Sequence, residues 1–442
     1  MDLRYRRAIY SVFIFIFFII SPLIIFYTLG YRYNFEKNRI ERTGVFFIKS
    51  YPKNATIYLN NKIQKRKTPT QINRLLSNNY NISVQKEGYF SWEKTLPIYP
   101  QTTTFIEDIT LFKTNSEPKL LLAGDFSQLS VSPNLNRLAL IKSNDNGYNL
   151  IYYNLLNDDS VSVFSSKNNL QISSWCLSNN KLIVKDKNDF LIVNIETKNT
   201  ESVFNLTRNY FDKIKCDYYN DNIFYGLSDG SLQQIDLIQK KLKKITPDEV
   251  ISFLPWKSKV LYISDDQDKF ILKSSSNNQI LKLLVMPTSA NYMFLPSADN
   301  YIAILDSDEK IAYIIDPQSD QPYNGIINHI YDIKWYDKQF IHWNDFELWV
   351  YYPESKKNIF IERASSEIQN SFWHTAFTYI FGQIDNQLKI FELDTRDKRN
   401  VYDLLTLSDQ TKDNIFVNKK GDALYLTDKI NNQEGFYKIE IQ

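Results

Sequence analysis

One pattern recurs from residue 120 to the end of the chain, and it constrains the fold more than any other feature. Each copy has an apolar strand, a short turn, a second apolar strand, an Asx-rich hairpin, a third strand and a polar loop. The copies are separated by 37 to 44 residues when their first strands are aligned on Val131, Trp175, Cys216, Phe253, Leu295, Trp335, Trp373 and Val417. Repeats of about 40 to 45 residues with several short strands are typical of β-propeller blades. We therefore expect an all-β propeller over residues 118–442.

The number of copies and the end of the chain bear on how the ring closes. Eight copies favour eight blades, and seven blades with one unit misassigned is the alternative. The eighth copy ends at Gln442, directly after its third strand, and so lacks a fourth. We expect residues 118–124 to supply this outer strand, because closing the ring leaves only short, protected sheet edges.

An apolar stretch near the N-terminus predicts a membrane segment. Ala8 to Leu29 is 22 residues long and uncharged, enough to cross a bilayer core of about 30 Å as a helix. No small-x-small cleavage site follows it, which favours an uncleaved anchor over a signal peptide. Three arginines in residues 1–7 favour a cytoplasmic head, a single transmembrane helix over 8–29 and an extracytoplasmic remainder. An inward-facing sensor is the alternative orientation.

Charge divides the rest of the chain into a basic and an acidic part. Residues 30–119, which begin with an expected linker over 30–43, hold 15 Lys and Arg against 7 Asp and Glu. Residues 120–442 hold 34 against 42. A basic segment beside a membrane is attracted to anionic lipid, so the bilayer is one expected partner. The acidic balance of the larger part argues against nucleic acid as another.

Short alternating strands broken by turn residues predict a small antiparallel sandwich over residues 44–112. This part resembles the PEGA domain, and the matching positions are Ser50-x-Pro52-x-x-Ala55, Thr68-Pro69, Tyr80-x-Ile82-x-Val84-x-Lys86-x-Gly88-Tyr89 and Trp92. The chain departs from the family at Asn54, which replaces a Gly, and at Asn60-Asn61, which replaces an Asp-Gly turn. Asn tolerates positive φ, so the turns should survive. The resemblance implies a surface module of bacterial envelope proteins that binds rather than catalyses, and it carries no functional residue.

The propeller copies resemble the WD-like and quinoprotein-like superfamilies in architecture only. Gly226 to Gly230 fits the G-x-S-x-G pattern, but it lies on an expected hairpin without a partner His, which favours a turn. His329, His342 and His374 lack metal-ligand spacing. We therefore expect no catalytic residue, no metal and no cofactor. Cys176 and Cys216 occupy similar places in neighbouring copies, and either a disulfide or two buried thiols fits them.

Aromatic residues are dense between 335 and 373. Alternate residues of a blade strand pack against the neighbouring blades, so core packing explains many of them. The competing hypothesis is a ligand platform for sugar rings or a peptide, built from Trp343, Trp373, His342 and His374.

These features together predict a membrane-anchored, extracytoplasmic binding or scaffold protein of the cell envelope. Its partner would be an envelope protein or a glycan. The alternative is an envelope glycan hydrolase or lyase with carboxylates around the central channel.

Overall fold

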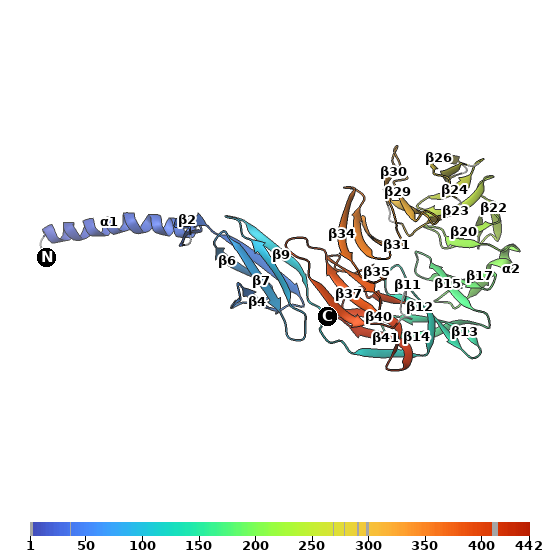
Figure 1. Cartoon of the computed structure of the whole chain (residues 1–442), viewed down its shortest axis with the longest axis horizontal. Helices are drawn as coiled ribbons and strands as arrows, with labels where there is room; N and C mark the ends of the chain where they lie inside the picture. The colour runs from blue at the N-terminus through green and yellow to red at the C-terminus, as the bar shows by residue number, and fades with distance from the viewer. Residues whose placement is uncertain are drawn as a thin grey trace. The chain divides into compact units, whose positions relative to one another are not determined.

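The computed structural model describes residues 3–35, 37–267, 269–277, 279–289, 291–297, 300–408 and 414–442. Met1 and Asp2 of the expected head lie outside them. The described chain is built of strands apart from two helices, α1 (Leu3–Thr28) and α2 (Val203–Thr207) (Figure 1). It divides into two compact units, one of residues up to 115 with 392–402 and 442, and one of 116–391 with 403–441. The expected all-β class with one N-terminal helix is confirmed.

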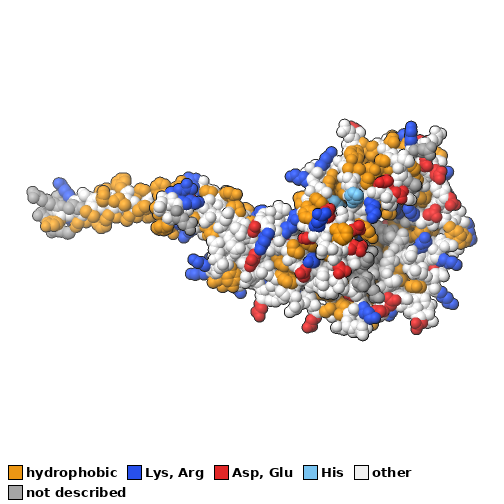
Figure 2. Space-filling view, in the orientation of Figure 1, with side chains coloured by type: hydrophobic (Ala, Val, Ile, Leu, Met, Phe, Trp, Pro, Cys, Tyr) orange, Lys and Arg blue, Asp and Glu red, His pale blue; other side chains and the backbone are white. Residues whose placement is uncertain are grey.

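Helix α1 is apolar and exposed. Its stretch Tyr5–Thr28 is 24 residues long, apolar enough to cross a membrane, and not buried by the rest of the chain. Figure 2 shows hydrophobic side chains along most of the described helix. A single helix of this kind suits either a membrane anchor or a signal sequence.

The segment expected as a linker contains a two-stranded hairpin, β1 (Tyr31–Asn34) paired with β2 (Arg39–Arg42). A polar contact holds it together, because the Asn34 amide donates to Glu41 Oε2 at 2.9 Å and both side chains are buried. The guanidinium of Arg32 lies 3.6 Å from the centre of the Tyr27 ring at the end of α1. Residues 31–34 and 39–42 thus form a hairpin within the stretch that was expected to be a linker.

Two facing sheets follow. One has the order β6-β3-β9 and the other β5-β4-β7-β8. Their strands are β3 (Gly44–Tyr51), β4 (Thr56–Leu59), β5 (Lys62–Ile63), β6 (Thr70–Leu75), β7 (Asn79–Gln85), β8 (Trp92–Pro97) and β9 (Thr103–Thr110). The expectation of a purely antiparallel sandwich was wrong, because β3 and β9 pair in parallel. The chain crosses from one sheet to the other between β8 and β9, so β9 enters from the same end as β3.

The sequence motif of this sandwich is held by a buried hydroxyl pair. Ser50 Oγ and Thr68 Oγ1 lie 2.6 Å apart, and Thr68 Oγ1 accepts a hydrogen bond from the Ala55 amide at 3.0 Å. The Ser-x-Pro-x-x-Ala and Thr-Pro parts of the motif therefore contact each other. A hydrophobic core that includes Trp92 closes around them.

The Asn residues that replace family glycines adopt the backbone conformation expected of them. The φ angles are 65° at Asn54, 47° at Asn60 and 62° at Asn61, and Gly88 has φ 79°. Asn visits this left-handed region more readily than most residues do. The turns are thus kept without glycine, as expected.

The first unit also includes the segment Glu392–Tyr402. The fully buried amine of Lys94 lies 3.2 Å from Glu392 Oε2, and the Trp92 indole donates to Glu392 Oε1 at 2.8 Å. Removing one partner of such a buried pair leaves an uncompensated charge, so the two residues depend on each other.

The described residues from 118 onward form eight four-stranded sheets. From inner to outer strand, they are β11 (Asp125–Val131), β12 (Arg137–Asn144), β13 (Gly147–Asn154), β14 (Asp159–Ser166); β15 (Leu170–Trp175), β16 (Lys181–Asp186), β17 (Asp189–Asn194), β18 (Thr200–Ser202); β19 (Lys213–Cys216), β20 (Ile223–Ser228), β21 (Ser231–Asp236), β22 (Lys241–Lys244); β23 (Glu249–Trp256), β24 (Lys259–Asp265), β25 (Phe270–Ser276), β26 (Gln279–Met286); β27 (Tyr292–Phe294), β28 (Ile302–Asp306), β29 (Ile311–Ile315), β30 (Tyr323–Ile327); β31 (Asp332–Tyr336), β32 (Gln339–Trp343), β33 (Glu347–Tyr352), β34 (Lys357–Arg363); β35 (Ile368–Trp373), β36 (Tyr379–Ile384), β37 (Gln387–Glu392), β38 (Val401–Thr406); and β39 (Ile415–Val417), β40 (Ala423–Ile430), β41 (Gln433–Glu440), β10 (Pro118–Ala123). The first strands are the inner ones, since β11 contacts β15, β23 contacts β27 and β31 contacts β35.

Contacts between neighbouring sheets run around the whole set. Hydrophobic clusters join each of the first five sheets to the next. The Trp373 indole donates to Lys334 O at 2.8 Å between the sixth and seventh, and His374 Nε2 lies 2.9 Å from Gly421 O between the seventh and eighth. A further cluster joins the eighth sheet to the first. The sheets therefore form a closed ring, a β-propeller.

The first and last parts of the propeller share one sheet. Strand β10, within the 118–124 stretch from which a fourth strand was expected, pairs antiparallel with β41 (Figure 1). Outer strands are more exposed than inner ones, and β22 consists of four exposed residues. This exposure explains why the repeat shows three strands clearly in sequence and the fourth only as a polar loop. The five-residue helix α2 was not expected.

The closing pair is sensitive to a side chain at Gly435, which pairs with Ala123 on β10. A Cβ on Gly435 would meet the Leu120 side chain and lie 2.9 Å from the Leu122 carbonyl oxygen. We expect Gly435→Val to lower the free energy of unfolding by about 1–3 kcal/mol, measured by urea denaturation of the detergent-solubilised chain. Gln433→Val, at an exposed position of β41, is the control and should change it by less than about 0.5 kcal/mol. Equal stability of the two variants would contradict the role of this strand pair.

Candidate functional site

A cavity with a volume of about 720 Å³ lies against the inner strands of four successive sheets. It is bounded by Gln171–Trp175 of β15, Asp212–Tyr218 around β19, Leu254 and Pro255 of β23, and Phe294–Pro296 at β27. Inner strands face the axis of the ring, so the cavity belongs to the central channel. Its volume falls in the range of about 300–1,000 Å³ typical of small-molecule sites.

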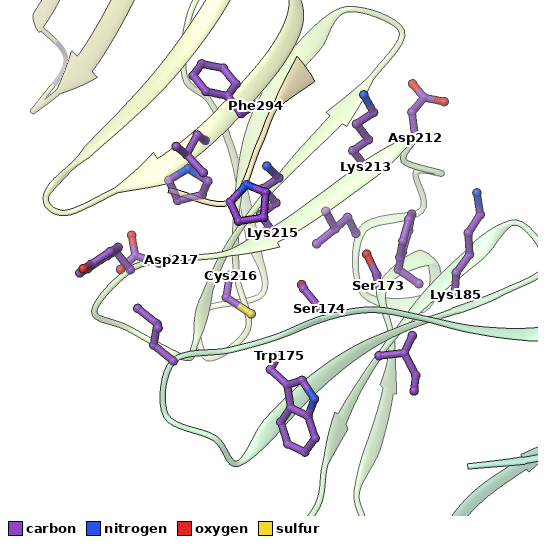
Figure 3. A pocket seen from close by; sticks show the side chains of 18 of the residues that line it. Ser173, Ser174, Trp175, Lys185, Asp212, Lys213, Lys215, Cys216, Asp217 and Phe294 are labelled. Atoms are coloured by element: carbon purple, nitrogen blue, oxygen red, sulfur yellow. The ribbon is translucent and has the colours of Figure 1, made fainter. Parts of the chain in front are cut away.

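Three lysines reach this cavity. Lys213 and Lys215 are two residues apart on β19, so their side chains leave the same face of the strand; Figure 3 shows both amines on that side. Lys185 approaches from β16. Among the described residues, no carboxylate forms an ion pair with any of the three.

Lys215 has the most unusual environment of these lysines. It is half-buried, and its amine lies 5.8 Å from the centre of the Phe253 ring. Burial and, as the smaller cause, the charge of Lys213 together lower the pKa of the Lys215 amine to about 8. Buried amines with a lowered pKa are more frequent at functional sites than elsewhere.

The two carboxylates at the cavity are already used by the protein. Asp217 accepts hydrogen bonds from the backbone amides of Tyr219 and Asn220, both at 2.9 Å, and from the Tyr225 hydroxyl at 3.2 Å. Asp212 accepts from the Asp229 amide at 3.2 Å. Both therefore shape the loops that border the cavity.

A disulfide links Cys176, which follows β15, to Cys216 of β19, and their Cα atoms are 5.5 Å apart. Of the two arrangements that the sequence left open, the structure has the bridge. It joins the second and third sheets, and its Cys216 lines the cavity (Figure 3).

The aromatic platform hypothesis does not agree with the structure. Trp343, Trp373, His342 and His374 are 2%, 9%, 4% and 2% exposed. His342 Nε2 lies 2.8 Å from Asn358 Oδ1, while Trp373 and His374 bridge neighbouring sheets. All four side chains are buried, which agrees with the competing explanation of core packing, and none of them lines the cavity.

Sequence reasoning missed the cavity lysines. The only signal was the alternation Lys213-Ile214-Lys215 in a predicted inner strand, which places two amines on one face. Among the described residues, no group of three or more His, Cys, Asp or Glu side chains has a geometry that suits a metal ion.

The fold and the cavity define a protein with a small sandwich and a β-propeller. Residues 43–115 match the family model of the PEGA domain, so this part of the chain is a PEGA domain. No curated protein matches the chain in sequence.

Several solved structures are similar to the chain at low identity. A eukaryotic initiation factor is 11% identical, with 72% of this chain and 89% of that chain covered and a TM-score of 0.51. The Dos1 propeller is 12% identical, covering 73% and 93%, with a TM-score of 0.49. The Swd1 β-propeller domain of Myceliophteria thermophila is 11% identical, covering 66% and 100%, with a TM-score of 0.41. Likeness at such identities concerns the fold alone.

The disulfide should contribute measurably to stability. It closes a loop with a sequence separation of 40 residues, and we expect the Cys176→Ser, Cys216→Ser double variant to lose about 2–4 kcal/mol of unfolding free energy. Urea denaturation of the oxidised wild-type chain is the reference. Alkylation of the denatured chain should modify no cysteine before reduction and both after it. Two modified cysteines without reductant would contradict the bridge.

His374 should make the propeller sensitive to acid. Its Nδ1 accepts the Ala376 amide at 3.1 Å, so Nε2 carries the proton and donates to Gly421 O. Burial lowers the pKa of His374 to about 4, whereas the unfolded imidazole titrates near about 6.5. Between these values the unfolded chain binds more protons, so the free energy of unfolding falls as pH drops from 6.5 towards 4.

We therefore expect His374→Gln to be less stable than the wild type at pH 7.5 but to lose less stability between pH 6.5 and 5. Urea midpoints at several pH values measure this slope. The exposed His329 supplies the control, since His329→Gln should keep the wild-type slope. A wild-type slope in His374→Gln would disprove the assignment.

Proposed function

We propose that this chain is a single-pass membrane-anchored binding protein of the cell envelope. Its PEGA domain and propeller lie outside the cytoplasm, and the propeller cavity holds a ligand. The cavity of about 720 Å³ among the inner strands is the observation that carries the proposal, because a mostly apolar hollow with a few polar groups is the usual form of a binding site.

Three features support the envelope location. The exposed apolar helix α1 suits an anchor. The arginines before it favour a cytoplasmic N-terminus. The Cys176–Cys216 bridge fits an oxidising compartment, where disulfides persist.

Binding is favoured over glycan hydrolysis by the state of the cavity carboxylates. Hydrolysis of glycosidic bonds typically needs an acid and a second carboxylate that can meet the substrate. Asp212 and Asp217 are instead hydrogen-bonded to the backbone of neighbouring loops.

Blocking the cavity tests the proposal. We expect the full-length chain in detergent to co-sediment with insoluble envelope material, and Ser173→Trp, which fills the cavity from β15, to reduce the bound fraction at least tenfold. Ser165→Trp, at an exposed site on the outer strand β14, should bind as the wild type does. Protease added to intact cells should degrade the part of the chain after α1.

Three results would count against the proposal. Protection from protease in intact cells would reverse the orientation. Equal binding by Ser173→Trp and Ser165→Trp would move the site away from the cavity. Release of soluble fragments from the envelope material, abolished by Ser173→Trp, would favour the enzymatic alternative.

A further inference from the structure

The cavity carries an excess of positive charge that the protein itself does not compensate. Lys185, Lys213 and Lys215 line it without an ion-pair partner among the described residues, while Asp212 and Asp217 are engaged by neighbouring loops. The propeller as a whole has the opposite charge balance, since residues 120–442 hold more acidic than basic side chains. A local cationic site in an acidic domain attracts anionic groups that can enter the channel.

Burial makes the charge on Lys215 costly in the empty cavity. Its neighbours across the strand pair and on the next sheet are Tyr225 and Phe253, both buried. An isolated ammonium in such surroundings lacks the water that stabilises it in solution. An acidic group in the cavity would restore that stabilisation as a charge-assisted hydrogen bond.

The remaining charged groups around Lys215 come from few elements. Lys213 and Asp217 lie on or next to β19, Asp212 precedes it, and Lys185 comes from β16. Strands β23 and β27 contribute apolar lining residues, among them Leu254 and Phe294. Burial raises the pKa of Tyr225 to about 12, so its hydroxyl stays neutral through the range in which Lys215 titrates.

The walls indicate more than a bare ion. Hydrogen-bonding side chains line the β15 side at Gln171, Ser173 and Ser174, and apolar surface lines the β23 and β27 sides. Hydroxyl and amide groups suit the hydroxyls of a sugar, and flat apolar surface suits the faces of its ring. The volume accommodates several rings in a row.

We propose that the propeller cavity binds an acidic glycan, with Lys213 and Lys215 as its principal anion contacts and Lys185 as a third. The proposal rests on the proposed binding function and specifies its ligand class. Carboxylate on a uronate chain and phosphate on a polyol phosphate chain present the same charge to these amines. An anionic ligand stabilises the protonated form of Lys215. Binding above the pH at which the free amine loses its charge is therefore accompanied by proton uptake.

Calorimetry on the full-length chain in detergent tests the proposal with three probes, a galacturonate trimer, a glycerol phosphate oligomer and neutral maltotriose. We expect at least one acidic probe to bind and maltotriose to bind at least tenfold more weakly. The acidic probe that binds tells whether the natural source is a carboxylate or a phosphate glycan. Affinity for that probe should fall as pH rises from 7.5 to 9, and binding at pH 8.5 should take up protons from the buffer.

Lysine variants separate this proposal from the general one. Lys215→Met should weaken the acidic probe at least tenfold and abolish proton uptake, and the exposed Lys213→Glu should weaken it at least as much. Lys241→Met, on the outer strand β22 of the same sheet, is the matched control and should bind as the wild type does. Unchanged melting temperatures show that each variant is folded. If Lys215→Met does not fold, Lys213→Glu still tests the proposal.

The outcomes distinguish failure of the acidic-glycan proposal from failure of the proposed binding function. Equal binding of maltotriose and the acidic probes, or wild-type affinity in both lysine variants, overturns the acidic ligand. If the wild-type chain retains envelope material but binds none of the probes, the acidic-glycan proposal fails and the binding function stands. If it retains nothing, the proposed function itself fails.

Discussion

The pairing of β10 with β41 is the contact on which the rest of the propeller depends. Each sheet has two apolar faces and is stable only when a neighbouring sheet covers each of them. In a ring this requirement is met everywhere only if the first and last sheets also touch, and the shared sheet makes them do so. The closure covers the remaining sheet edges and brings eight inner strands to one axis. The cavity exists because those strands cannot fill the axis completely.

Lys94 of the first unit and Lys215 of the second differ in the partners of their amines. Lys94 is fully buried in the first unit and has a carboxylate and two backbone carbonyls within hydrogen-bond distance. Lys215 of the second unit has an aromatic ring and a like charge close by. A structural lysine normally has its partners built in. Lys215 differs from Lys94 in that no carboxylate among the described residues partners it.

The PEGA motif and the propeller repeat both consist of residues that hold the fold together. The Ser50, Thr68 and Ala55 contacts show that the motif is a set of backbone and hydroxyl interactions that hold a small sandwich. The repeat likewise encodes inter-sheet packing, and this is where Trp373 and His374 are found. The proposed ligand contacts are instead residues that depart from both patterns, such as lysines at inner positions where apolar residues would pack.

Much of the architecture could be predicted from the chain because its signals are local. A period near 40 residues, Asx hairpins, the missing strand after residue 440, the uncharged stretch at 8–29 and Asn at turn positions each act within one element or between neighbours in sequence. Strand alternation also showed that Trp343 and Trp373 face a neighbouring sheet or a surface. It could not show which, because that depends on how tightly the next sheet packs. The cavity was beyond local patterns altogether, since its walls come from strands of four sheets between residues 170 and 296 that meet only when the ring closes.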